Sequence, residues 1–109
     1  MRLPAIGALR RRLLVEAATE AADGAGGAIR SWTPLASVWG RIEPRGRGER
    51  VADGRATGRV THRVTIRRRD GIGGGVRFVA GGVRYRVVAV EDLDPARRFL
   101  VCLCEEEQA

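Results

Sequence analysis

The feature that most constrains the fold is a strict alternation of apolar and polar residues along residues 59–69, RVTHRVTIRRR. Val60, His62, Val64 and Ile66 fall on one side of this segment, and the intervening Thr and Arg residues fall on the other. A period of two is typical of an antiparallel strand with one face in a core and the other in water or on a partner. The chain is therefore expected to be built around β-strands.

Tight turns separate further segments of this kind. Gly81-Gly82 lies between two apolar segments and predicts a two-residue hairpin loop. DGIGGG at residues 70–75 is typical of a Gly-rich turn, and EDLDPAR at residues 91–97 contains a Pro-initiated turn. Besides residues 59–69, strands are expected at residues 10–17, 31–43, 76–80, 83–90 and 99–104.

The first of these strands has a competing interpretation. Residues 8–22 are rich in Ala, Leu, Glu and Arg, which are good helix formers. The hairpin chemistry of DGAGG at residues 23–27 favours a strand instead. Pro34 lacks an N–H group, so we expect it at a sheet edge or a bulge. The predicted fold class is all-β: one domain over residues 1–109, a small six-stranded antiparallel barrel or sandwich.

A long basic loop is expected between the second and third strands, at Pro44–Gly58. It holds four Arg and four Gly, and Val51 is its only sizeable apolar residue, so it cannot bury enough surface to offset its own ordering. Residues 41–70 hold ten Arg and four acidic residues, a net +6 of the total +7. This excess of positive charge favours a polyanionic partner. The use of Arg in place of Lys is weaker evidence for such a partner, because the whole chain lacks Lys.

Catalysis, metal binding and cofactor binding are not expected. Cys102 and Cys104 lie two positions apart in an extended segment, where they share a face and are expected to be small buried side chains. The only His, His62, is on the apolar side of its strand and has no local nucleophile or metal-ligand partner. The N-terminus lacks the apolar run of a secretory signal, and no segment is long enough to span a membrane. We expect a soluble intracellular protein.

Two kinds of partner fit the basic charge. A cytoplasmic β-barrel could bind nucleic acid through phosphate contacts without reading sequence, because the chain has no helix-turn-helix or zinc-finger pattern. The strand faces offer no convincing aromatic platform for stacking bases. Alternatively, the Arg excess could bind an acidic protein.

The ordered motifs resemble a known family over nearly the whole chain. A leading G-x-L-R-x-R (Gly7 to Arg12) is followed by two Trp seven positions apart (Trp32 and Trp39). THRVTIR (Thr61 to Arg67), R-F-x-x-x-G-x-x-Y-x-V (Arg77 to Val87) and an apolar strand ending in C-x-E follow. Together they resemble the head-closure, or head–tail joining, proteins of long-tailed bacteriophages and gene transfer agents.

This resemblance implies a non-enzymatic neck component. The family's small barrels form a ring, here of six or twelve copies, between the portal-bound adaptor ring and the tail terminator ring. Such a protein is made in the bacterial cytoplasm and ends in the neck of the released particle, where its basic loop faces double-stranded DNA in the channel. Residues expected in or near that lumen are Arg45, Arg47, Arg50, Arg55 and Arg59. Residues expected in the core or a subunit interface are Trp32, Trp39, Val64, Ile66, Tyr85, Val87, Leu100, Val101 and Leu103.

Overall fold

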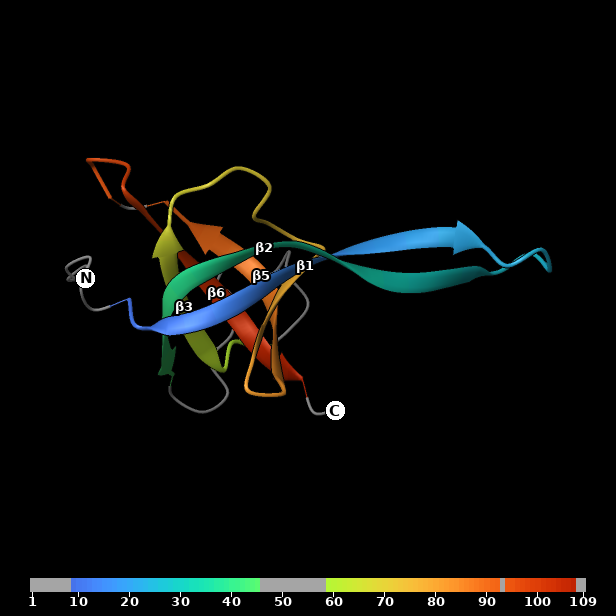
Figure 1. The fold of residues 1–109 in the computed structure, drawn as a ribbon, viewed down its shortest axis with the longest axis horizontal. Coiled ribbons are helices and arrows are strands. Elements are labelled where there is room, and N and C mark those ends of the chain that lie inside the picture. Colours follow the sequence, from blue (N-terminus) through green and yellow to red (C-terminus); the bar gives the residue numbers. More distant parts are fainter. Residues whose placement is uncertain (1–8, 46–58, 93, 108–109) are drawn as a thin grey trace.

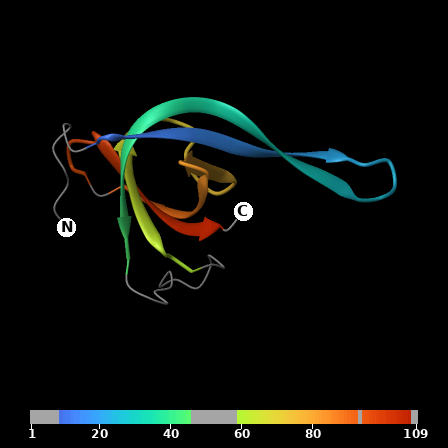
Figure 2. The same ribbon diagram turned by 60° about the horizontal axis from the view of Figure 1, so that its bottom comes forward.

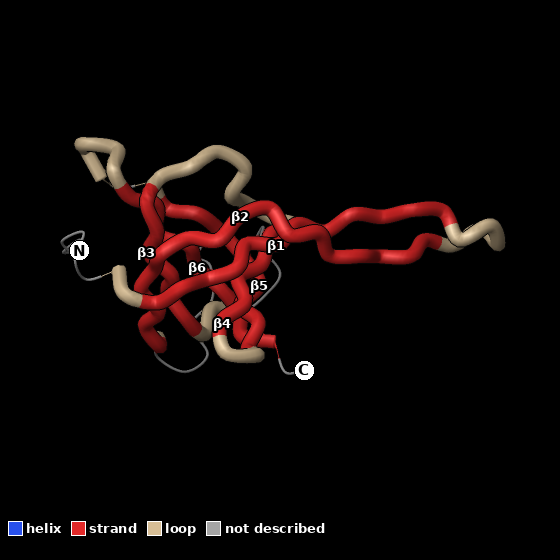
Figure 3. Tube along the Cα trace, in the orientation of Figure 1, coloured by secondary structure: helices blue, strands red, loops and turns tan. Residues whose placement is uncertain are grey.

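The computed structural model describes residues 9–45, 59–92 and 94–107, and within these ranges the chain forms strands and no helix (Figure 3). The strands are β1 (Arg11–Ala22), β2 (Ala28–Pro44), β3 (His62–Arg67), β4 (Val76–Ala80), β5 (Val83–Glu91) and β6 (Phe99–Glu107). They pair antiparallel and close into a barrel in the order β1-β2-β3-β6-β5-β4 (Figure 1). The all-β prediction is confirmed, and the helix considered for residues 8–22 is wrong. The described part of the chain contains no helix with the length and apolar character needed to cross a membrane.

The barrel interior is filled by alternate side chains of its strands, which curve around it (Figure 2). The core centres on Leu13 of β1, Ile66 of β3 and Phe78 of β4, none of which has exposed surface. Gly40 of β2 leaves room for this packing, because a Cβ there would lie 2.5 Å from Leu13 Cδ1 and 3.1 Å from the backbone oxygen of Thr65. The period-two pattern in the sequence thus selects the residues that build the core.

The predicted turns form between these strands. Gly81 and Gly82 both have positive φ, 57° and 81°, as the hairpin joining β4 and β5 requires. In the turn before β6, the Arg97 N–H donates to the Asp94 carbonyl oxygen at 2.8 Å, with Pro95 between them. Two backbone N–H groups, those of Ala96 and Arg98, donate to the Asp94 carboxylate at 3.1 and 2.8 Å. These contacts fix the loop that follows β5.

β1 and β2 are longer than predicted and extend past the barrel. β4 pairs with β1 only as far as Ala17, and β3 pairs with β2 only from Gly40 onward, so the far halves of β1 and β2 pair only with each other. A bulge opposite Val15 and Glu16 leaves Leu35 without a partner beside Pro34, where the sequence predicted an edge or bulge. Strict alternation would place Trp32 and Val38 on the same face of β2. The bulge shifts the alternation by one residue, so these two side chains lie on opposite faces.

β6 occupies a central position in the sheet, which is one of the two places, with a subunit interface, that suit a strand apolar on both faces. It lies between β3 and β5, and its residues 99–104 are all buried. The Arg/Thr face of β3 is not wholly in water or on a partner, however, because Thr65 is only 2% exposed within the single chain. Thr65 lies in register between Arg41 of β2 and Val101 of β6, and Val101 is itself buried. The outer face of β3 is therefore partly covered by side chains of the adjoining strands.

Candidate functional site

The base of the predicted basic loop is held at the end of the barrel where β2 finishes and β3 begins. The Arg45 N–H donates to the Thr61 carbonyl oxygen at 2.8 Å, and the Thr61 N–H donates to the Cys104 carbonyl oxygen at 2.8 Å. The Thr61 hydroxyl accepts a hydrogen bond from the Glu106 N–H at 2.7 Å. Thr61 therefore links the end of β2 to β6, so Arg45 and Thr61, the described residues near the two sides of the basic segment, are held next to each other.

His62 adds a polar contact to the same frame. Its Nδ1 lies 2.9 Å from the Thr61 hydroxyl and its Nε2 lies 3.7 Å from Glu106 Oε1. Its ring meets the Tyr85 ring edge-on with centroids 5.0 Å apart. His62 is thus a half-buried histidine with local partners, and no nucleophile or ligand set converges on it among the described residues.

The second feature is a hairpin projecting sideways from the barrel, which we call the arm and define as Thr19–Ser31 (Figure 1). Every residue of the arm is exposed. Its turn is built locally, because the Asp23 carboxylate accepts hydrogen bonds from the Ala25 and Gly27 N–H groups at 2.8 and 3.0 Å. These hydrogen bonds, with that of Ala25 the larger contribution, lower the pKa of Asp23 below its ordinary value. The tip of the arm is therefore an ordered turn that carries the negative charge of Asp23.

The root of the arm is anchored to the barrel. The Ala18 N–H donates to the Gly75 carbonyl oxygen at 2.8 Å. The Arg77 guanidinium lies 4.0 Å from the centre of the Trp32 ring, and Arg77 Nε donates to Glu16 Oε1 at 2.7 Å. A two-stranded ribbon is marginally stable by itself in water, so these contacts set the direction in which the arm leaves the barrel.

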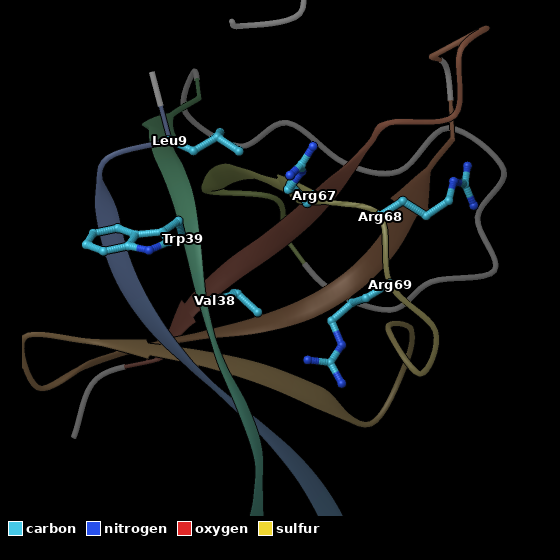
Figure 4. A pocket seen from close by; sticks show the side chains of 6 residues that line it. All are labelled: Leu9, Val38, Trp39, Arg67, Arg68 and Arg69. Atoms are coloured by element: carbon cyan, nitrogen blue, oxygen red, sulfur yellow. The ribbon is translucent and has the colours of Figure 1, made fainter. Parts of the chain in front are cut away.

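The third feature is a pocket of about 350 Å³ beside the first residues of β1, which we call the Trp39 pocket (Figure 4). Its lining combines apolar and basic side chains: Leu9, Val38, Trp39, Arg67, Arg68 and Arg69. Trp39 is 51% exposed and lies under the Arg12 guanidinium, 5.0 Å from its ring centre. The pocket lies where β3 leaves β2, so the adjoining edge of β2 has no strand partner within the described ranges.

Two of the pocket's three arginines are available to a ligand. Arg68 forms an ion pair with Asp92, and its Nε donates to the Arg97 carbonyl oxygen at 3.0 Å. Arg67 and Arg69 form no ion pair with a residue of the described ranges. The pocket therefore suits an apolar group accompanied by negative charge.

The structure distributes the residues predicted from sequence over several places. Val64, Ile66, Tyr85, Val87 and Leu100 lie in the core. Val101 and Leu103 are buried, Trp32 is half-buried at the root of the arm, and Trp39 is exposed in the Trp39 pocket.

Among the basic residues, Arg45 is half-buried at the base of the loop and Arg59 is exposed. Arg47, Arg50 and Arg55 lie outside the described residues. Sequence reasoning did not find the arm or the Trp39 pocket. In the sequence, the only signal for the arm is the DGAGG turn, and the only signal for the Trp39 pocket is the run RRR at residues 67–69.

The cysteines are buried as expected. Cys102 and Cys104 are free and belong to the core. Burial raises the pKa of Cys102 to about 12, and burial together with the neighbouring Cys102 raises the pKa of Cys104. Among the described residues no three His, Cys, Asp or Glu side chains gather in a way that could hold a metal ion.

Fold and surface together define a small closed β-barrel with a projecting hairpin and a surface pocket. The comparisons agree with this class. A family model described as phage head completion protein matches residues 4–107, so the chain belongs to the phage head completion proteins, which are structural components and not enzymes. No curated protein matches the sequence.

Solved structures show the same fold. A chain from the virion of a native gene transfer agent particle is 29% identical, with a TM-score of 0.69 over 93% of this chain and 97% of that one. A protein of Shigella flexneri 2a, solved in solution, is 24% identical, with a TM-score of 0.69 over 93% of this chain and 95% of that one. The expected resemblance to phage and gene transfer agent head proteins is confirmed.

Proposed function

We propose that copies of this chain form a ring in the neck of a phage or gene transfer agent particle, joining the DNA-filled head to the tail. Six or twelve copies would lie between the portal-bound adaptor ring and the tail terminator ring. Membership of the head completion family and the likeness to a chain of a gene transfer agent virion support this position. Assembly would take place in the bacterial cytoplasm, before the particle is released.

The basic segment at residues 44–58 supplies the second half of the proposal, which is retention of DNA in the channel. The observation that supports it is the hydrogen-bonded frame around Thr61, which holds Arg45 and Thr61, on either side of residues 46–58, at one end of a closed barrel. A ring would repeat the Arg residues of the segment around its axis. Such a collar attracts DNA phosphates without reading bases, so it suits a channel through which any sequence must pass.

Particles that carry variants of the basic segment test this role. Replacing Arg45, Arg47, Arg50 and Arg55 together by Ser should leave heads joined to tails but lower the fraction of particles that keep their DNA. The same four residues replaced by Lys should retain DNA nearly as wild type, because phosphate attraction needs the charge more than the guanidinium shape. Equal DNA retention in the Ser and Lys particles would contradict the channel role.

A further inference from the structure

The two strands of the arm pair only with each other within the described ranges. Its residues from Thr19 to Ser31 are all exposed, and Ile29, at 57% exposure, is the most exposed of the large apolar side chains in the described ranges. A protruding ribbon with unpaired edges invites pairing with another chain unless it is covered. The arm is therefore a surface that lacks its partner in the isolated molecule.

The chemistry of the arm argues against nucleic acid as that partner. It carries Glu20 and Asp23 but only one basic residue, Arg30, which lies 3.4 Å from Glu20. Hydrogen bonds from the Ala25 and Gly27 N–H groups stabilise the charged form of the Asp23 carboxylate and lower its pKa. A net negative tip with one projecting Ile would be repelled by phosphates and attracted by a basic surface with an apolar floor.

The Trp39 pocket is such a surface on the same chain. Leu9 and Val38 give it apolar walls, while the Trp39 ring lies at its rim on the other side of β2 (Figure 4). Arg67 and Arg69 add positive charge, and neither forms an ion pair with an acidic residue of the described ranges. Its volume of about 350 Å³ is in the range of sites that enclose small apolar groups. Pocket and arm tip are thus complementary in both charge and polarity.

The arm cannot reach the pocket of its own chain. Trp39 pairs with Arg12 near the start of β1, whereas Ile29 pairs with Ala21 near its end. Ten residues of extended strand separate Ile29 from Trp39, which is roughly 33 Å at 3.3 Å per residue. Two complementary surfaces at opposite ends of the β1–β2 pair suit a head-to-tail contact between copies, and such contacts close into rings when the rotation allows.

We infer that the tip of the arm of one copy, with Ile29 at its centre, binds the Trp39 pocket of the next copy. This inference rests on the ring proposed above and names the contact that would hold it together. The arm would also cover the exposed Trp39 and bring Glu20 and Asp23 toward Arg67 and Arg69.

Chemical cross-linking in assembled particles tests the contact. The natural thiols are buried, so cysteines introduced by Ile29→Cys and Trp39→Cys supply the reactive groups for a short bismaleimide. The double variant should give a ladder of covalent multimers of this chain on a denaturing gel. The control is the pair Leu35→Cys with Trp39→Cys. Leu35 is about as exposed as Ile29, 48% against 57%, but it lies away from the tip of the arm. This control should give no ladder.

The outcomes separate this inference from the proposed function. Particles that contain the protein in the neck but yield no ladder overturn the contact and leave the neck role standing. Two other results also overturn the contact: dimers from Ile29→Cys alone, which mean tip-to-tip pairing, and cross-links to a different protein. Absence of the wild-type protein from particles overturns the neck role and the contact together.

A second variant avoids cross-linking altogether. Ile29→Ser changes an exposed residue, so the melting temperature of the isolated chain should match wild type. If the contact buries Ile29, its loss should weaken each contact roughly tenfold and reduce the yield of joined particles. An unchanged yield would contradict the inference.

Discussion

Replacing Gly40 by Ala tests the packing that closes the barrel. Gly40 is buried in β2, opposite Arg11 of β1 and Ile66 of β3. An added Cβ would lie 2.5 Å from Leu13 Cδ1, 3.1 Å from the backbone oxygen of Thr65 and 3.2 Å from Ile66 Cγ2. Leu13 could turn aside only within a filled core, and the Thr65 carbonyl belongs to a strand paired on both sides. The neighbouring atoms therefore cannot all move away.

The magnitude follows from two opposing effects. Overpacking a well-filled core costs about 1–3 kcal/mol of unfolding free energy. Ala also restricts the unfolded chain, which returns about 0.4–1 kcal/mol. The midpoints of the two ranges leave a net loss of about 1.3 kcal/mol, equivalent to a melting temperature lower by roughly 5–10 °C in a domain of this size.

Thermal unfolding followed by circular dichroism measures this difference, and urea titration gives the free energy. Gly74→Ala is the matched control, because a Cβ at Gly74 would meet nothing within 4 Å and its φ is not positive. The control should melt at or above the wild-type temperature. If Gly40→Ala melts with the control instead of well below it, the reasoning about the closed core is refuted.

Three further predictions concern single groups. Thr61→Val should cost about 1 kcal/mol of unfolding free energy, because the Glu106 N–H loses its acceptor, while Thr19→Val on the exposed arm should change it by less than about 0.5 kcal/mol in the same urea titration. Burial raises the pKa of the Asp94 carboxyl, but hydrogen bonds from the Arg98 and Ala96 N–H groups outweigh it, so the folded pKa lies below 3.8. That stabilisation is present above the unfolded pKa and is lost as the pH falls through the folded pKa. The melting temperature of Asp94→Asn should accordingly lie further below wild type at pH 7 than at pH 3. Both thiols should resist a thiol reagent in the native chain and react on unfolding, since burial raises their pKa; rapid labelling of the folded protein would contradict the buried positions.

The strands and turns were predictable because each depends on short-range patterns. The alternation through Val64 and Ile66 and the Gly81-Gly82 turn determine which residues face the core and where the chain reverses. The central position of β6 followed from its six consecutive apolar residues, which only a strand buried on both faces can carry.

The arm was not predictable from the same kind of evidence. Ala17, Ala18, Ala21 and Ala22 have the i, i+4 spacing of a helix and not the period of two of a strand, and cross-strand pairing with β2 keeps them extended. The bulge at Leu35 also reverses the alternation, so Trp32 packs on Arg77 outside the barrel. The length of β1 and the bulge in β2 both depend on how the two strands pair, so the sequence of one strand alone does not predict them.

The Trp39 pocket was hidden for a different reason. Its lining comes from the approach to β1, the middle of β2 and the residues that follow Ile66, which the barrel closure brings together. The RRR run at residues 67–69 was interpreted as a strand face, while the structure places it around a pocket beside Leu9 and Val38 (Figure 4). The registers of β1 with β2 and of β2 with β3 bring these segments together, and these registers could not be derived from the sequence.

The neck role is tested most directly by negative-stain microscopy of particles from a producer that lacks this gene. The account predicts separate tails beside tailless heads that have lost or are leaking their DNA, and restoration of joined particles when the gene is supplied again. Normal tailed particles that keep their DNA would contradict it.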